Sequence, residues 1–221
     1  MRLKWDEAGT RLYETGVEKA VIYPVTSDGN YGTGVAWNGV ISVTSSPTGG
    51  EASPIYANRM KIAETVKPVN RDGEIEAFTY PDVVAACDGT ASLIPDMRIA
   101  PYGKRRRFGL VYRTGIGNDI LDLEYGYKIH IHYGCMVSPS ALPRATVNEQ
   151  PGLSRFKWKF TTIPTAIAGF SPSSYICIDT AESAPENINL LEDVLFGTNW
   201  TEPRLPSPED IFEIMEEHGD D

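Results

Sequence analysis

The sequence predicts a mainly β protein, in which a β-sandwich or barrel carries one flanking α-helix and a helical C-terminal extension. Short segments rich in Val, Ile, Tyr, Phe and Thr follow one another along residues 17–180, separated by Gly, Pro, Asn and Asp. Many short strands with turn residues between them are typical of sandwiches and barrels. The regular alternation of strands with helices that builds a parallel sheet is absent.

Eight segments are expected to be strands, and several alternate between apolar and polar residues. Phe156, Trp158 and Phe160 point to one side of their segment, and the lysines between them point to the other. This pattern predicts a strand with one buried face and one face open to water or to a partner. The eight segments are residues 17–25, 34–44, 73–80, 90–100, 107–115, 125–137, 155–163 and 173–180.

Few helices are expected. Residues 81–89 begin with Pro and stop at Gly89, which are the usual start and stop residues of a helix. A second helix is predicted to end at Gly197, with Ser183 and Glu186 forming a capping box at its start.

The last helix is expected to begin at Ser207, which would cap its N-terminus. Its apolar residues predict that it docks on the body of the protein or on a neighbouring molecule, because a wholly solvated tail would not need them. These docking residues are Ile211, Phe212, Ile214 and Met215.

The net charge of −10 belongs to the C-terminal end of the chain. Residues 182–221 contain twelve of the thirty acidic residues and only one basic residue, Arg204. The remaining body is therefore close to neutral. The acidic segment would repel phosphates, which argues against nucleic-acid binding by that segment.

The segment "GYKIHIHYGC" (126–135) carries His130 and His132 on one face of a predicted strand, with Lys128 beside them. Two such histidines can chelate a metal, but a catalytic zinc needs a third protein ligand. Cys135 would share their face only if a bulge intervened, and Lys128 would repel a cation. A structural strand is therefore favoured over a metal site. The three cysteines are expected to be buried thiols.

Other motifs are incomplete. "TGIGND" (114–119) lacks the third glycine of a dinucleotide-binding turn, and "GFSPS" (169–173) is not the nucleophile elbow of a hydrolase. The basic run at 104–107 is the best candidate for nucleic-acid contact. No aromatic residues interleave with it, so a solvated turn or an ion-pair cluster between subunits is favoured.

Several long strings identify a family resemblance, in order, from about residue 3 to 197. They include "KWDEAGTRLYETGVEKAVIYP" (4–24), "GVAWNGVISVTSSPTGGEASPIYANRMK" (34–61), "IEAFTYPDVVAACDGT" (75–90), "FGLVYRTGIGND" (108–119) and "YGYKIHIHYG" (125–134). These strings resemble the major tail protein, or tail tube protein, of long-tailed non-contractile bacteriophages of the siphovirus type. The residues after Gly197 are not part of the pattern.

The resemblance implies a structural virion protein without catalytic residues or cofactors. Its copies would form stacked, usually hexameric rings, and their strands would line a tube through which double-stranded DNA passes without specific binding. Other expected partners are the tape measure protein and the tail terminator and tip proteins. The protein would be made in the bacterial cytoplasm and reside in the virion tail tube, with no membrane partner. Residues 1–197 would be the tube domain and 198–221 an acidic extension.

The tube interpretation assigns roles to particular residues. The long segment 44–59, rich in Pro, Gly and Ser, is expected to be a loop that orders on an adjacent ring. Glu74 and Glu76 alternate with apolar residues and are candidates for an acidic row facing the lumen. Candidates for contacts between subunits or rings are Trp5, Tyr13, Trp37, Pro47, Pro54 and Tyr56.

Two other classes of function stay open at this point. A β-sandwich of the adhesin or carbohydrate-binding type would use exposed aromatic residues as its platform. A metalloenzyme would use His130 and His132. A tube protein should polymerise, a carbohydrate-binding module should stay small, and a metalloenzyme should retain metal through dialysis.

Overall fold

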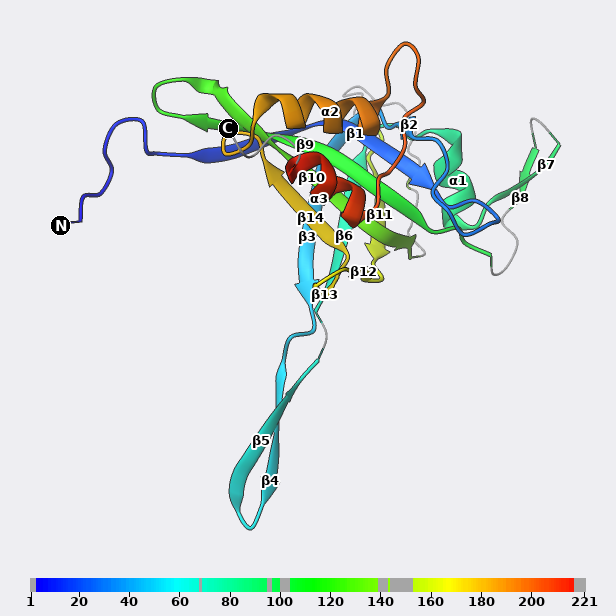
Figure 1. Cartoon of the computed structure of the whole chain (residues 1–221). Coiled ribbons are helices and arrows are strands. Elements are labelled where there is room, and N and C mark those ends of the chain that lie inside the picture. The colour runs from blue at the N-terminus through cyan, green and yellow to red at the C-terminus, as the bar shows by residue number, and fades with distance from the viewer. Residues whose placement is uncertain are drawn as a thin grey trace.

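The computed structural model describes residues 3–67, 69–94, 97–99, 104–138, 143 and 153–216. The fold is mainly β, as predicted, with one large antiparallel sheet of eight strands in the order β2-β1-β9-β10-β11-β6-β3, and β14 also paired to β10 (Figure 1). The strands of the large sheet are β1 (Tyr13–Pro24), β2 (Val35–Ala36), β3 (Val40–Thr48), β6 (Asn70–Ala77), β9 (Phe108–Asn118), β10 (Asp122–Val137), β11 (Phe156–Thr161) and β14 (Tyr175–Asp179).

Strand β10 joins the two halves of this sheet. Up to Cys135 it pairs with β9, up to His132 it also pairs with β14, and at Met136 and Val137 it pairs with β11. The register shifts between His132 and Cys135, where Gly134 has a φ of 60°. A Cβ at Gly134 would collide with the backbone of Ile163, so this bulge requires glycine.

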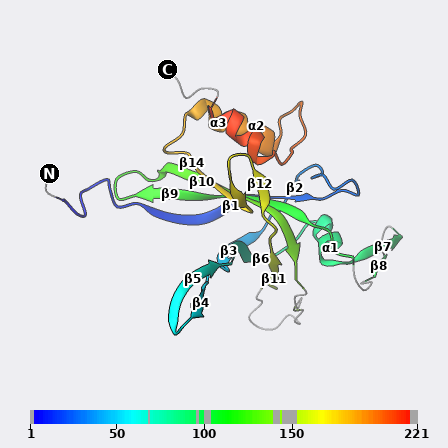
Figure 2. The same cartoon turned by 60° about the horizontal axis from the view of Figure 1, so that its bottom comes forward.

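The bulge lets the sheet fold over an inner core. The inner cluster contains residues of β1, β6, β9, β10 and β11, and Trp158 and Phe160 on β11 are buried in it as their alternation predicts. Helix α1 (Asp82–Asp88) adds Val84 and Cys87, and ends at Gly89 with a φ of 97°, as expected. The two halves of the sheet therefore enclose this core in the manner of a sandwich (Figure 2).

Helices α2 (Pro185–Phe196) and α3 (Pro208–Glu216) cover the opposite face of β1, β9 and β10 (Figures 1 and 2). The predicted capping box of α2 is wrong, because Ser183 donates its hydroxyl hydrogen bond to the backbone oxygen of Asp179 and Ala184 is the N-cap. The predicted cap of α3 is confirmed: the hydroxyl of Ser207 accepts a hydrogen bond from the backbone N–H of Asp210 at 3.1 Å.

The C-terminal segment docks on its own body. Ile211 is only 2% exposed and shares the outer cluster with Leu191 and Leu205. The backbone N–H of Arg204 donates to the oxygen of Val194 at 2.9 Å, and the Tyr133 hydroxyl donates to the oxygen of Pro206 at 3.0 Å. The extension expected from residue 198 is thus part of the body, because its apolar residues complete a core that α2 alone leaves open.

The segment expected to be a long loop is instead largely strand. Strand β3 continues to Thr48, and β4 (Ala52–Ala57) pairs with β5 (Met60–Val66) in a separate two-stranded ribbon. Asn58 and Arg59 have φ values of 50° and 63°, which suit the two-residue turn of a twisted hairpin. The prediction of a loop is wrong, because it gave more weight to Pro and Gly, which favour turns, than to Ile and Tyr, which favour strands.

Two other segments divide differently from the prediction. Residues 34–44 contain β2 and the start of β3 rather than one strand. Residues 90–100 contain β7 (Ala91–Ile94) and β8 (Met97–Ile99), which pair with each other. A further small hairpin joins β12 (Thr165–Ile167) and β13 (Phe170–Ser173).

Candidate assembly interface

The β4–β5 ribbon projects from the body and is covered by nothing on the described part of the chain (Figure 1). Every residue of both strands is exposed. Its large apolar side chains are each more than two-fifths exposed, which is unusual for residues of this kind. They are Ile55, Tyr56, Met60, Ile62 and Val66.

The two faces of the ribbon differ in character. Ile55 pairs with Ala63, and Ala57 pairs with Met60, so one face is mostly apolar. On the other face Tyr56 and Val66 lie beside Lys61 and Glu64, which form an ion pair. One face is therefore without charge and suited to burial against a partner, and the other combines apolar and charged side chains.

The N-terminal arm, residues 3–12, is a second projection. Its base is held at the turn between β9 and β10, where Asp119 accepts a hydrogen bond from the N–H of Gly9 at 2.9 Å and pairs with Arg11 at 3.3 Å. Beyond this anchor Trp5 is 74% exposed. Tyr13, at the start of β1, lies over Gly117 and remains partly exposed.

The remaining contact candidates fall into two groups. Pro47 and Pro54 are exposed on β3 and β4, where a second molecule can reach them. Trp37 is only 3% exposed, because its ring packs edge-on against Trp158 at 5.3 Å and its N–H donates to the oxygen of Thr79 at 2.9 Å. Trp37 therefore packs mainly in the inner core, and its contact with another subunit stays a prediction that is limited to the part of the ring that lines the groove described below.

Glu74 and Glu76 do share a face of β6, while Ile75 and Ala77 point into the core. They do not form a bare acidic row. Lys157 on β11 lies 3.3 Å from Glu74 and 3.2 Å from Glu76, and its hydrogen bond lowers the pKa of Glu76. Arg155 also approaches Glu76 at 3.4 Å. The face is a ladder of opposite charges that is close to neutral.

The two histidines lie in a cluster of aromatic side chains. His130 contacts the Thr114 hydroxyl at 2.7 Å through Nε2 and the Tyr175 hydroxyl at 2.8 Å through Nδ1. His132 is fully buried, and both of its ring nitrogens lack a hydrogen-bond partner. Both rings stack on Tyr112, at 4.6 and 5.9 Å between centroids. Burial lowers the pKa of His130, and it lowers that of His132 to about 3.

These contacts leave the histidines without the surroundings of a metal centre. Among the described residues, no group of three or more His, Cys, Asp or Glu side chains is placed to hold an ion. Cys135 does reach the same side of the sheet as His132, because of the bulge at Gly134, but its thiol is buried in the inner cluster. Of the three cysteines, Cys177 is exposed, contrary to expectation.

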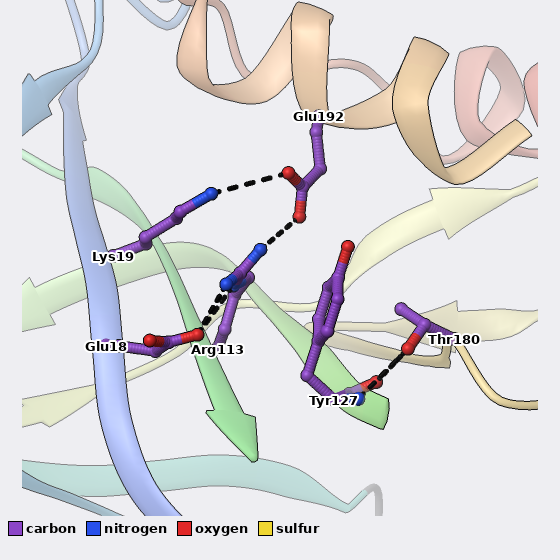
Figure 3. A network of polar contacts seen from close by, with 6 residues as sticks. All are labelled: Glu18, Lys19, Arg113, Tyr127, Thr180 and Glu192. Atoms are coloured by element: carbon purple, nitrogen blue, oxygen red, sulfur yellow. Dashed lines mark hydrogen bonds and ion pairs between the residues drawn. The ribbon is translucent and has the colours of Figure 1, made fainter. Parts of the chain in front are cut away.

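An ion-pair network fastens α2 to the sheet (Figure 3). Arg113 on β9 pairs with Glu18 on β1 and with Glu192 on α2, both at 2.5 Å, and its guanidinium lies 4.0 Å from the centre of the Tyr127 ring. Lys19 reaches Glu192 at 3.5 Å. The network positions the C-terminal half of α2 over the outer edge of β1.

A groove of about 510 Å³ lies at this edge of β1. Its apolar lining comes from three parts of the chain that only the tertiary structure brings together, and Glu18, Lys19 and Asn38 complete it. The apolar residues are Val17, Ala36, Trp37, Val40, Phe196 and Pro203. Nothing in the sequence pattern marked this groove.

The basic run at 104–107 is partly used within the chain. Arg107 donates to the backbone oxygen of Gly134 at 3.1 Å, and Arg105 donates to that of Asp88 at 3.3 Å.

The predicted docking residues of α3 differ in their burial. Ile214 and Met215 pack against the outer cluster, while Phe212 is 40% exposed and stacks on Phe170 at 5.9 Å.

The exposed aromatic residues do not come from one surface element. Trp5 belongs to the arm, Tyr56 to β4, Phe170 to β13 and Trp200 to the loop after α2. A flat sugar-binding platform usually gathers such rings on one surface, so this scatter does not favour the carbohydrate-binding alternative.

The chain matches no protein-family model, and no curated protein has significant sequence similarity to it. No helix in the described residues is long and apolar enough to cross a membrane. The interpretation of function therefore depends on the exposed projections, the sheet edges and the groove.

Proposed function

We propose that this chain is the structural subunit of a hollow polymer, the tail tube of a long-tailed, non-contractile bacteriophage. Copies would form hexameric rings that stack into the tube, and genomic DNA would pass through it into the host. The chain would have no catalytic role. The observation that carries the proposal is the β4–β5 ribbon, which projects from the body with an uncovered apolar face.

The ribbon supports assembly on energetic grounds. An isolated two-stranded hairpin is marginally stable in water, and exposed clusters of apolar side chains mark interaction sites. Burying a side chain such as Ile55 or Met60 against a partner contributes about 1.5–3 kcal/mol each. A neighbouring copy supplies such a partner at every position of a repeating polymer.

The open edges of the large sheet also support assembly. Within the described residues, β2 and β3 lie at the two ends of the large sheet, and β14 pairs only with β10. Open edges are aggregation hazards in a monomer. A head-to-tail arrangement of identical copies gives each edge a partner and closes into a ring.

The charge ladder on β6 and β11 suits a lumen. Glu74 and Glu76 are matched by Lys157 and Arg155, so the face attracts phosphates weakly. Strong DNA binding depends on several unpaired basic contacts. A lining of paired charges would let DNA slide, and it would also accommodate the tape measure protein before DNA enters. Tail terminator and tip proteins would close the two ends of the tube.

Electron microscopy and sedimentation of the purified full-length chain test this proposal. The expected result is tubes of constant diameter at high protein concentration. Ile55→Asp should prevent tube formation, because it places a charge on the apolar face of the ribbon. Leu190→Asp on α2 is the matched control, since Ile55 and Leu190 are both 43% exposed.

The control variant should still form tubes, and both variants should melt at the wild-type temperature. A wild-type chain that stays monomeric at every concentration contradicts the proposed function. Normal tubes from the Ile55→Asp chain would show that the ribbon does not carry assembly.

A further inference from the structure

The groove beside β1 is an apolar hollow with a polar rim, and no other part of the described chain occupies it. Its volume of about 510 Å³ lies in the range of roughly 300–1,000 Å³ that small-molecule sites occupy. An indole ring is smaller than the ligands of such sites. Trp37 and Phe196 contribute aromatic walls, so the hollow suits a flat apolar group.

The strand edge that borders the groove is unsuited to receiving another strand. On its outer side β1 pairs with β2 only at Val21 and Ile22, so the preceding residues have no strand partner there among the described residues. Register shifts between Thr15 and Val21, and positive φ values at Gly16 and Lys19, break the regular ladder. Bulges of this kind protect an edge from strand addition, so an inserted side chain is the better fit.

The N-terminal arm presents such a side chain. Trp5 is 74% exposed and lies beyond the anchor formed by Gly9, Arg11 and Asp119. In the structure the arm leaves the body in the direction away from β2 and from the C-terminal end of α2, where the groove lies (Figure 1). The arm and the groove therefore lie at opposite ends of the molecule, which suits contact between successive copies rather than within one copy.

The charges around Trp5 match those around the groove. Lys4 and Asp6 flank the tryptophan, and Glu18 and Lys19 lie side by side at the groove. The side chains of Glu18 and Lys19 are 52% and 49% exposed, so both remain accessible beside their partners in the ion-pair network. Within one chain Lys4 pairs with Glu7 at 2.9 Å, so docking of the indole would exchange existing, exposed ion pairs for pairs between two copies.

We propose that the indole of Trp5 in one copy of this chain occupies the groove between β1 and the C-terminal end of α2 in the next copy. The inference rests on the proposed function, because it requires the chain to assemble with itself. It goes further by assigning one donor side chain and one receptor groove. Each copy in the assembled ring would then donate its N-terminal arm to one neighbour and receive the arm of the other neighbour, an arrangement called arm exchange below.

Disulfide trapping tests the assignment in the full-length chain. Cys177 is replaced by Ser, because it is the exposed native thiol, and Lys4→Cys and Asn38→Cys are introduced together. A disulfide forms only when the two Cα atoms lie within about 7 Å. Oxidation of assembled protein should give a ladder of covalent multimers on a non-reducing gel, and adding Trp5→Ala should abolish the ladder.

A second measurement compares two exposed tryptophans. Trp5→Ala should raise the concentration needed for assembly by about tenfold or more, as expected for loss of a buried aromatic anchor. Trp200→Ala should change it by less than about twofold, because Trp200, although 93% exposed, does not line the groove and lies outside the arm.

The outcomes separate the two proposals. Wild-type tubes without cross-linked multimers overturn the arm exchange and leave the tube function standing. A cross-link confined to monomers also overturns it, because the arm then fills its own groove. A wild-type chain that never assembles overturns both.

Discussion

At the scale of single residues, the two histidines of β10 behave as flat aromatic units. Tyr112 stacks on both of them, and His132 also contacts Phe160 edge-on at 5.7 Å and Tyr175 at 4.8 Å. His130 satisfies both ring nitrogens, whereas His132 satisfies neither. A buried polar group without a partner costs roughly 1–3 kcal/mol. The ring of His132 therefore stabilises the core by packing, while its two unpaired nitrogens destabilise the folded state.

The first prediction concerns His132→Phe. At pH 7 the free energy of unfolding of this variant should be at least as large as that of the wild type, because phenylalanine keeps an aromatic ring and removes two unsatisfied nitrogens. The unfolded histidine takes up a proton near pH 6.5, while the folded one stays neutral down to about 3, so protons favour the unfolded state. Wild-type stability should fall by up to about 1.4 kcal/mol per pH unit below 6.5 through this group, and the variant should lack that component.

Urea unfolding of both proteins at several pH values between about 4 and 8 measures how the free energy of unfolding of each depends on pH. Tyr112→Phe is the control, because it alters the same stack without removing the titrating group. Identical pH dependence in His132→Phe and the wild type would contradict this account of the residue.

At the scale of elements, α2 and α3 act as one cover over the sheet. The network of Arg113, Glu18 and Glu192 fixes α2, and the amide of Asn187 donates to the backbone oxygen of Met215 at 2.9 Å, which joins α2 to α3. The Tyr23 hydroxyl also donates to the backbone oxygen of Leu195. Residues 185–216 of the acidic C-terminal segment are therefore a structural element of the monomer.

The second prediction compares neighbouring residues of α3. Ile211→Ala should lower the free energy of unfolding by about 2–5 kcal/mol, because Ile211 is almost fully buried in the outer cluster. Phe212→Ala should lower it by less than about 1.5 kcal/mol, because Phe212 is 40% exposed and its main ring contact is Phe170. Denaturant titration of both variants checks the difference, and equal losses would mean that the helix does not dock as described.

The strands illustrate how far local pattern reaches. The alternation in β11 correctly placed Trp158 and Phe160 in the core, because a strand's side chains alternate whatever surrounds it. The turn at Asn58 and Arg59 could have been predicted from the sequence, since Asn tolerates a positive φ. The burial of Trp37 was not, because it depends on Trp158 and Thr79, which are distant in the sequence.

At the scale of the whole molecule, the N-terminal arm and the β4–β5 ribbon leave the body in different directions (Figure 1). The arm carries Trp5 and the ribbon carries Ile55, Tyr56 and Met60, all exposed. An isolated monomer gains nothing from such groups in water. In the proposed tube both projections would be buried between copies.

The third prediction follows from this arrangement. Trypsin should cut the monomer rapidly after Lys4 in the arm and after Arg59 in the turn of the ribbon, because both segments are exposed and lack cover. The same sites should be protected in assembled protein, while Lys157 within β11 stays uncut in both forms. Mass spectrometry of timed digests identifies the cuts. Equal cleavage rates in monomer and assembly would contradict burial of the projections.

The sequence by itself determined the mainly β class, most strand positions, the stop of α1 at Gly89, the cap of α3 and the docking character of its apolar residues. These features depend on side-chain alternation, helix periodicity and backbone preference, which act over a few neighbouring residues. Only the tertiary structure decided that the C-terminal segment belongs to the body, that Glu74 and Glu76 meet Lys157, and that β1, α2 and the residues around Trp37 enclose a groove. Those outcomes depend on which distant segments meet when the sheet folds at Gly134, and pairing at that range leaves no mark on the local pattern.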